Sequence, residues 1–172
     1  GAVQVRLYPM VFDMFGKASN KRLIRDFIKT GIHTGCGSQH FKVGPTKIML
    51  DGSSSGPSCA VIEGYSHDPG NHGIQVWEQA EADEIVLEAH KAGFQVTAHA
   101  VGDQAVTIMV NAIEKALVQY PRENHRHRIE HCGLTNPELI ARIAKLGIIP
   151  ISNPSFITIN GRDYNRYYGD RV

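Results

Sequence analysis

The sequence lacks the features that would place it in several specialised classes of protein. Its 172 residues include 18 lysines and arginines against 17 aspartates and glutamates, which gives a formal net charge of +1. This balance argues against nucleic-acid binding, which usually needs a clustered excess of basic residues. No apolar run approaches the roughly 20 residues that span a bilayer, and Gly1 to Pro9 lack the charged-then-apolar order of a signal peptide. We therefore expect a cytoplasmic protein that binds neither nucleic acid nor membrane.

Cysteine is scarce, and the common phosphate-binding motifs are missing. Cys36, Cys59 and Cys132 are an odd number at wide spacing, which fits neither a disulfide framework nor a CxxC metal site, so we expect free thiols. Neither GxGxxG nor GxxxxGK follows an expected strand, so a dinucleotide or P-loop site has no support. With 42% hydrophobic and 20% charged residues, the composition is that of a globular protein, and one domain over residues 1–172 is expected.

The order of the periodic segments predicts an α/β fold. Five strands are expected, over Val3–Phe12, Thr46–Leu50, Phe94–His99, Arg126–His131 and Ile148–Ser152. Four helices are expected, over Lys21–Lys29, Glu78–Ala92, Asp103–Tyr120 and Pro137–Leu146. Strands that alternate with helices in this way favour a parallel sheet with right-handed crossovers.

Polar residues lie where the expected strands end. These residues are Asp51, His99, His131 and Asn153, and the carboxyl ends of parallel strands are where α/β folds place their sites. His99 and His131 are 131 − 99 = 32 residues apart, which is one β-α-β step, so they should be neighbours. Two converging neutral imidazoles are typical of half of a zinc-like site. The alternative is that each is a hydrogen-bonded core histidine.

Lys47 lies inside the expected Thr46–Leu50 strand, on the same side as Met49 and Asp51. A buried lysine is costly unless it is neutralised, paired or chemically changed. Three interpretations remain open for it: a lysine at a sheet edge that reaches water, a CO2-modified lysine that bridges metal ions, and an amine that forms a Schiff base.

Side-chain alternation gives expectations for two further groups. Arg128 and Glu130 alternate with His131 and are expected to face the helices as an ion pair. The large aromatic residues could line an apolar pocket or bury an edge of the core. They are Trp77, Phe156, Tyr164, Tyr167 and Tyr168.

The segments VTAHAVGDQAV and RHRIEHCGL, with TKIMLDGS upstream, resemble the amidohydrolase superfamily, and within it the N-substituted formamide deformylase-like, exoenzyme-regulator-like branch. The resemblance covers nearly the whole chain. It implies a distorted (β/α)8 TIM barrel that uses one or two divalent metal ions, usually zinc, to hydrolyse amide-like C–N bonds of small molecules. By position, it implies that Lys47 is the carboxylated lysine of strand four, His99 the ligand of strand five and His131 the ligand of strand six.

The sequence also departs from this family. Members of the family carry an HxH metal motif on the first strand and a general-base aspartate on the eighth. Neither can be placed in this sequence, so no catalytic residue is assigned. If Val3–Phe12 is the third strand, the chain supplies strands three to seven, and we expect a fragment of a barrel. Unpaired sheet edges would favour a homo-oligomer. Two alternatives to the hydrolase remain, a catalytically silent module that self-associates and a Schiff-base lyase that uses Lys47.

Overall fold

The structure is a computed structural model that describes residues 7–14 and 16–171. Its centre is a parallel sheet in the order β1-β2-β3-β4. The strands are β1 (Thr46–Met49), β2 (Val96–Ala100), β3 (Arg128–His131) and β4 (Ile149–Ser152). The helices are α1 (Lys17–Lys29), α2 (Gln79–Lys91), α3 (Asp103–Gln119), α4 (Pro137–Leu146) and α5 (Ser155–Tyr168), followed by a 3-10 turn, Gly169–Arg171.

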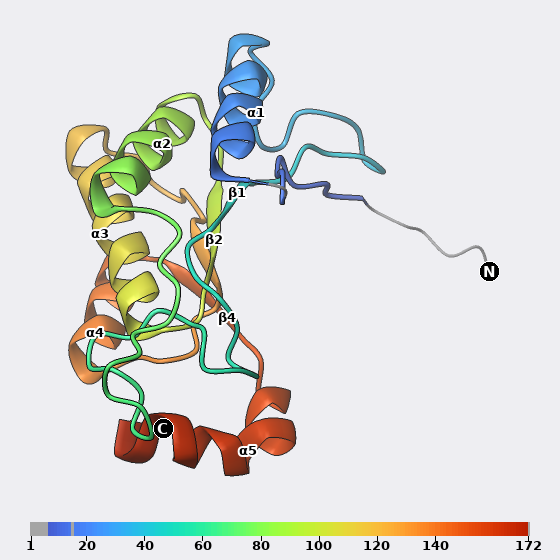
Figure 1. Ribbon diagram of the computed structural model, residues 1–172. Helices are drawn as coiled ribbons and strands as arrows, with labels where there is room; N and C mark the ends of the chain where they lie inside the picture. The colour runs from blue at the N-terminus through green and yellow to red at the C-terminus, as the bar shows by residue number, and fades with distance from the viewer. Residues whose placement is uncertain (1–6, 15, 172) are drawn as a thin grey trace.

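The helices pack against one face of this sheet. Figure 1 shows α2, α3 and α4 along one side of the strands, while α5 follows β4 directly and lies across the end of the sheet. Ile48, Ala98 and Ile129 are paired across β1, β2 and β3 and are at most 3% exposed, because they point into the helix layer. Since strand side chains alternate between faces, the residues on either side of these three point to the other face.

Helix α4 begins and ends as its sequence predicts. The side-chain oxygen of Asn136 accepts a hydrogen bond from the N–H of Leu139 at 2.9 Å, and Pro137 occupies the first helical position. Gly147 ends the helix in the left-handed conformation, with φ of 66°. These are the N-cap, N1 and C-cap signals that favour a helix of this length.

The first expected strand, Val3–Phe12, is corrected by the structure. Residues 3–6 lie outside the described residues, and the remainder makes single bridges and no strand. Val11 forms one parallel bridge to Thr46, at the outer edge of β1. A second parallel bridge lies at Leu7. Pro9, between the two bridges, accepts from the N–H of Gly44 but has no N–H to donate, so the bridges do not join into a strand.

Helix α5 has no counterpart among the predicted elements. Its sequence, SFITINGRDYNRYY, is rich in β-branched residues, asparagine and glycine, whose helix propensity is low. Packing stabilises it: Tyr168 is 1% exposed with its hydroxyl 3.3 Å from Cys59 Sγ, and Ser66 N–H donates to the carbonyl of Tyr167. Tyr168 and Trp77, which is also 1% exposed, therefore fill the core.

Strand β4 is the outer strand of the described sheet, and a proline lies within it. The N–H of Ile149 donates inward to the carbonyl of His127 at 2.9 Å. The next N–H along the strand would point outward, but that residue is Pro150, which has none. Proline at this position makes the edge a poorer template for another strand. No helix within the described ranges is long and apolar enough to cross a membrane.

At the amino ends of the strands, His90, His127 and His125 form a buried histidine chain. His90 Nε2 donates to the carbonyl of Tyr120, so its Nδ1 accepts from His127 Nε2 at 2.8 Å. His127 Nδ1 then accepts from the N–H of Val96. His125 Nδ1 accepts from His127 N–H, and its Nε2 donates to a backbone carbonyl of α4. Every ring nitrogen is used, and each ring is neutral with the proton on Nε2.

Acid is expected to destabilise the fold through His127. Burial lowers the pKa of His127 to about 2, and the nearby positive charge of Arg122 acts in the same direction. A histidine in the unfolded chain has a pKa near 6.5. Between the folded and the unfolded pKa, the unfolded chain binds more protons than the folded protein, so the free energy of unfolding falls as the pH drops below about 6.5. Between about pH 7.5 and about pH 5, His127 alone should cost about 2 kcal/mol of unfolding free energy.

Urea unfolding at the two pH values, with His127→Asn beside the wild type, measures this cost. Asparagine keeps an oxygen for the N–H of Val96 but cannot be protonated, so the variant should lose less stability on acidification. His40→Asn, at an exposed position, serves as the control and should follow the wild type. Equal pH dependence of His127→Asn and wild type would contradict the assignment.

Candidate functional site

The carboxyl ends of β2 and β3 bring His99 and His131 together. Their ring centroids lie 4.7 Å apart in an edge-to-face arrangement. The sheet register places Lys47 on the same face as His99, because Met49 pairs with His99 and Lys47 pairs with Thr97. The three residues named from the sequence therefore belong to one face, with the two histidines in contact and Lys47 one side-chain row behind His99.

The alternation expected for β3 is wrong at this end of the strand. Glu130 pairs with His99 and Arg128 with Thr97. Both charged residues therefore lie with His99 on the face of the sheet that points away from the helices, the open face. They do form the expected ion pair, with Arg128 Nε 2.7 Å from Glu130 Oε1. His131 should then point into the helix layer, but its φ of 72° is in the left-handed region and breaks the alternation.

Two acceptors fix the orientation of the His99 ring. Its Nε2 donates to the carbonyl of Gly52 at 2.6 Å and lies 3.4 Å from Asp51 Oδ1. The Nδ1 lone pair is left without a hydrogen-bond partner among the described residues. Burial lowers the pKa of His99, and the positive charge of Lys47 lowers it further. The ring is therefore neutral near pH 7, which is the state that binds a metal ion.

The His131 ring is held by the segment that follows β4. Its Nδ1 lies 2.6 Å from Asn153 Oδ1, and the Phe156 ring stacks on it at 5.6 Å between centroids. An amide oxygen only accepts, so the proton is on Nδ1 and the Nε2 lone pair is left without a partner within the described part of the chain. The histidine pair thus offers two free imidazole nitrogens.

Lys47 is half-buried on the open face of the sheet. Its Nζ lies 5.3 Å from the centroid of the Phe12 ring, a distance at which the ring face attracts a cation. The structure thus gives Lys47 an aromatic neighbour that the sequence analysis did not expect.

Asp51 joins three segments around the histidine pair. Its carboxylate is fully buried and accepts hydrogen bonds from the backbone N–H groups of Ala60, Val101 and Gly102, at distances between 2.8 and 3.2 Å. Burial raises the pKa of Asp51 to about 6, although these N–H donors lower it. The carboxylate thereby ties the end of β1 to the following loop and to the start of α3, and places the Gly52 carbonyl next to His99.

Gly102 in the AHAVGD segment has no room for a side chain. A Cβ atom built there would lie 1.8 Å from the carbonyl oxygen of Ala60. This close approach of two backbones is the reason that glycine is required between His99 and Asp103. Asp103, which we expected near a helix start, accepts from the N–H groups of Ile62 and Gln104.

Replacing Asp51 by asparagine should loosen this junction. The substitution puts an NH2 group against the N–H of Val101 or of Gly102, so a buried donor loses its acceptor. We expect a loss of about 2–3 kcal/mol in the free energy of unfolding, measured by urea denaturation at neutral pH. Asp163→Asn, at an exposed position, is the matched control. An Asp51→Asn protein as stable as the control would contradict this role.

Within residues 7–14 and 16–171, no three histidine, cysteine, aspartate or glutamate side chains are grouped so that they could hold a metal ion. The nearest carboxylate to the histidine pair is Asp51, whose oxygens already accept backbone N–H groups. The two imidazoles nevertheless suit zinc, which prefers nitrogen and sulfur ligands. The described residues thus fit part of a metal shell.

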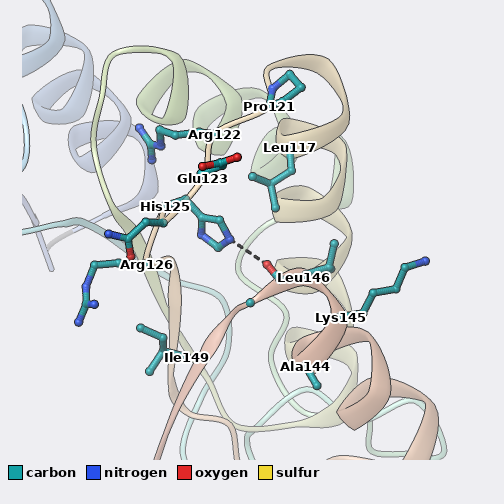
Figure 2. A pocket seen from close by; sticks show the side chains of 12 residues that line it. Leu117, Pro121, Arg122, Glu123, His125, Arg126, Ala144, Lys145, Leu146 and Ile149 are labelled. Carbon is teal, nitrogen blue, oxygen red and sulfur yellow. Dashed lines mark hydrogen bonds between the residues drawn. The ribbon is translucent and has the colours of Figure 1, made fainter.

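A hollow of about 780 Å³ lies at the opposite, amino end of the strands. Figure 2 shows His125 at its centre, with Nε2 bonded to the carbonyl of Leu146, while the charged ends of Arg126 and Lys145 extend in different directions. Both nitrogens of His125 are engaged. The hollow therefore offers no free imidazole nitrogen, unlike the histidine pair.

The model of the amidohydrolase family matches residues 4–170. The chain belongs to the amidohydrolase family. The chain is 34% identical over 119 residues to the putative amidohydrolase YtcJ of Bacillus subtilis, an alignment that covers 69% of the chain and 22% of YtcJ. It is 25% identical over 127 residues to N-substituted formamide deformylase of Arthrobacter pascens, covering 74% of the chain and 23% of that protein.

The fold of the chain also matches a solved structure. An uncharacterized metal-dependent hydrolase from Pyrococcus furiosus aligns with a TM-score of 0.75 and 25% identity, covering 88% of the chain and 31% of that protein. The chain thus spans under a third of the length of these relatives. The comparisons confirm the predicted family and the α/β class, here with four parallel strands that alternate with helices in the described part of the chain.

Sequence reasoning found the two histidines but assigned no role to the residues that hold them. Asp51 and Asn153 were noted only as polar residues at strand ends. Gly52 acts through its carbonyl, which no side-chain pattern reports, and Phe156 contacts His131 from a helix that was not predicted. The one available signal was the position of Asp51, Gly52 and Asn153 just after the expected strands.

Proposed function

We propose that this chain contributes metal ligands to a hydrolase of amide-like C–N bonds in small molecules. The observation that supports it is the histidine pair, in which His99 offers Nδ1 and His131 offers Nε2, with ring centroids 4.7 Å apart. Two imidazoles that were merely structural would use their nitrogens, as the buried histidine chain does.

In this proposal His99 and His131 are metal ligands and Lys47 is a third. A divalent cation bound there, zinc by preference, supplies the Lewis acidity that amide hydrolysis requires. The role of the chain is to keep both imidazoles neutral and fixed in orientation. Burial lowers the pKa of His99, and Asp51 maintains the loop that carries its acceptor. No general base is assigned among the described residues.

Lys47 would act in this site as its carbamate. The ammonium group first loses a proton to the solvent; the neutral amine then adds to CO2, a nitrogen–carbon bond forms, and the nitrogen releases a second proton to the solvent. A cation thereby becomes an anionic oxygen ligand. Its place on the open face, one row behind His99, supports this role. The relative named as an N-substituted formamide deformylase makes N-substituted formamides the first substrates to assay.

Metal analysis of the purified protein tests the histidine pair. After incubation with zinc and removal of free metal, the wild type should retain close to one equivalent, and the variant with both His99→Ala and His131→Ala should retain only background. The control His40→Ala, at an exposed position, should retain as much as the wild type. Equal zinc in the double variant and wild type would contradict the proposed site.

Lys47 is tested by carbon-13 NMR of the zinc-treated protein in labelled bicarbonate. A carbamate signal is expected in the wild type and should be lost in Lys47→Gln, while Lys42→Gln, on the loop before β1, should keep it. Wild-type protein that shows no carbamate signal, and is instead trapped by borohydride with a carbonyl compound, would favour a Schiff-base lyase over the hydrolase.

A further inference from the structure

Two residues of the segment after β4 contact the His131 ring, one at its edge and one on its face. Asn153 Oδ1 lies 2.6 Å from Nδ1, and the ring of Phe156 stacks at an interplanar angle of 23°. The turn itself is closed by a hydrogen bond from the N–H of Phe156 to the carbonyl of Asn153 at 2.9 Å. The two contacts are thus set by one short backbone segment.

The two histidines of the pair are held through opposite nitrogens. His99 donates from Nε2 to a backbone carbonyl, that of Gly52, whereas His131 donates from Nδ1 to a side chain. Which nitrogen of a neutral imidazole carries the proton is set by the hydrogen bond it makes. The Gly52 carbonyl is a backbone group and remains whichever side chain is substituted. The acceptor for His131 is a side chain, so its tautomer depends on the identity of Asn153.

We propose that Asn153 is a positioning residue that fixes His131 as the Nδ1–H tautomer and thereby leaves Nε2 free for the metal. This inference rests on the proposed function, because it assigns a purpose to one nitrogen of a proposed ligand. Without the amide oxygen, Nδ1–H has no acceptor among the described residues, and the proton can move to Nε2. In that tautomer Nε2 carries the proton and has no lone pair to offer to a metal ion.

The tautomer is measured directly on the metal-free protein by long-range proton–nitrogen-15 NMR of the imidazoles, with His131→Gln used to assign the signals. The wild type should show His131 as Nδ1–H. Asn153→Leu is nearly the same size but accepts no hydrogen bond, and should shift the population toward Nε2–H. Asn153→Asp retains an acceptor and should restore the wild-type pattern.

Asn165→Leu makes the same change at an exposed position of α5 and should leave the signals of His131 unchanged. A wild-type His131 protonated on Nε2, or an Asn153→Leu protein that remains Nδ1–H, would overturn the proposal. Urea unfolding of both leucine variants shows whether any difference between them reflects stability.

Zinc affinity gives the second readout, measured by competition with a chelator. Loss of a residue that orients a metal-bound histidine usually weakens metal binding by roughly 10–100-fold, and we expect a loss in this range for Asn153→Leu and near wild-type affinity for Asn153→Asp. Unchanged affinity in Asn153→Leu, with zinc bound to the wild type, overturns the role of Asn153. If Asn153→Leu shows the tautomer change but the wild type binds no zinc, the proposed function is refuted and the tautomer assignment remains supported.

Discussion

The arrangement at the carboxyl end of the sheet depends on the buried carboxylate of Asp51. A single side chain accepts backbone N–H groups from the loop at Ala60 and from the turn at Val101 and Gly102. These donors would otherwise be buried without partners, which is costly. By satisfying them, the carboxylate fixes where β1 ends and where α3 begins. The Gly52 carbonyl, and with it the His99 ring, follows from that junction.

The fold contains two clusters of neutral histidines, and their hydrogen bonds distinguish structure from chemistry. At the amino end of the strands, the buried histidine chain uses every ring nitrogen within the protein. At the carboxyl end, His99 and His131 each use one nitrogen. Burial lowers the pKa of His127 at the amino end and of His99 at the carboxyl end. The difference is that one cluster is complete without a ligand and the other has one unused lone pair per ring.

The open face of the sheet surrounds the histidine pair with charge and aromatic rings. Lys47 lies against Phe12, Arg128 pairs with Glu130, and Phe156 covers His131. These contacts come from separate elements, so the surroundings of the pair depend on how the strands align and on where α5 begins.

The sequence by itself determined the alternation of strands and helices, the caps of α4 and the meeting of His99 with His131, because periodicity and capping act over a few residues and parallel strands align their ends. Tertiary structure decided the rest. Helix α5 forms despite low propensity because Tyr168 packs beside Cys59. The left-handed φ of His131 reverses the side that alternation predicts, and the bridge at Val11 replaces an expected strand. Each of these depends on contacts between residues distant in sequence, which a local pattern does not contain.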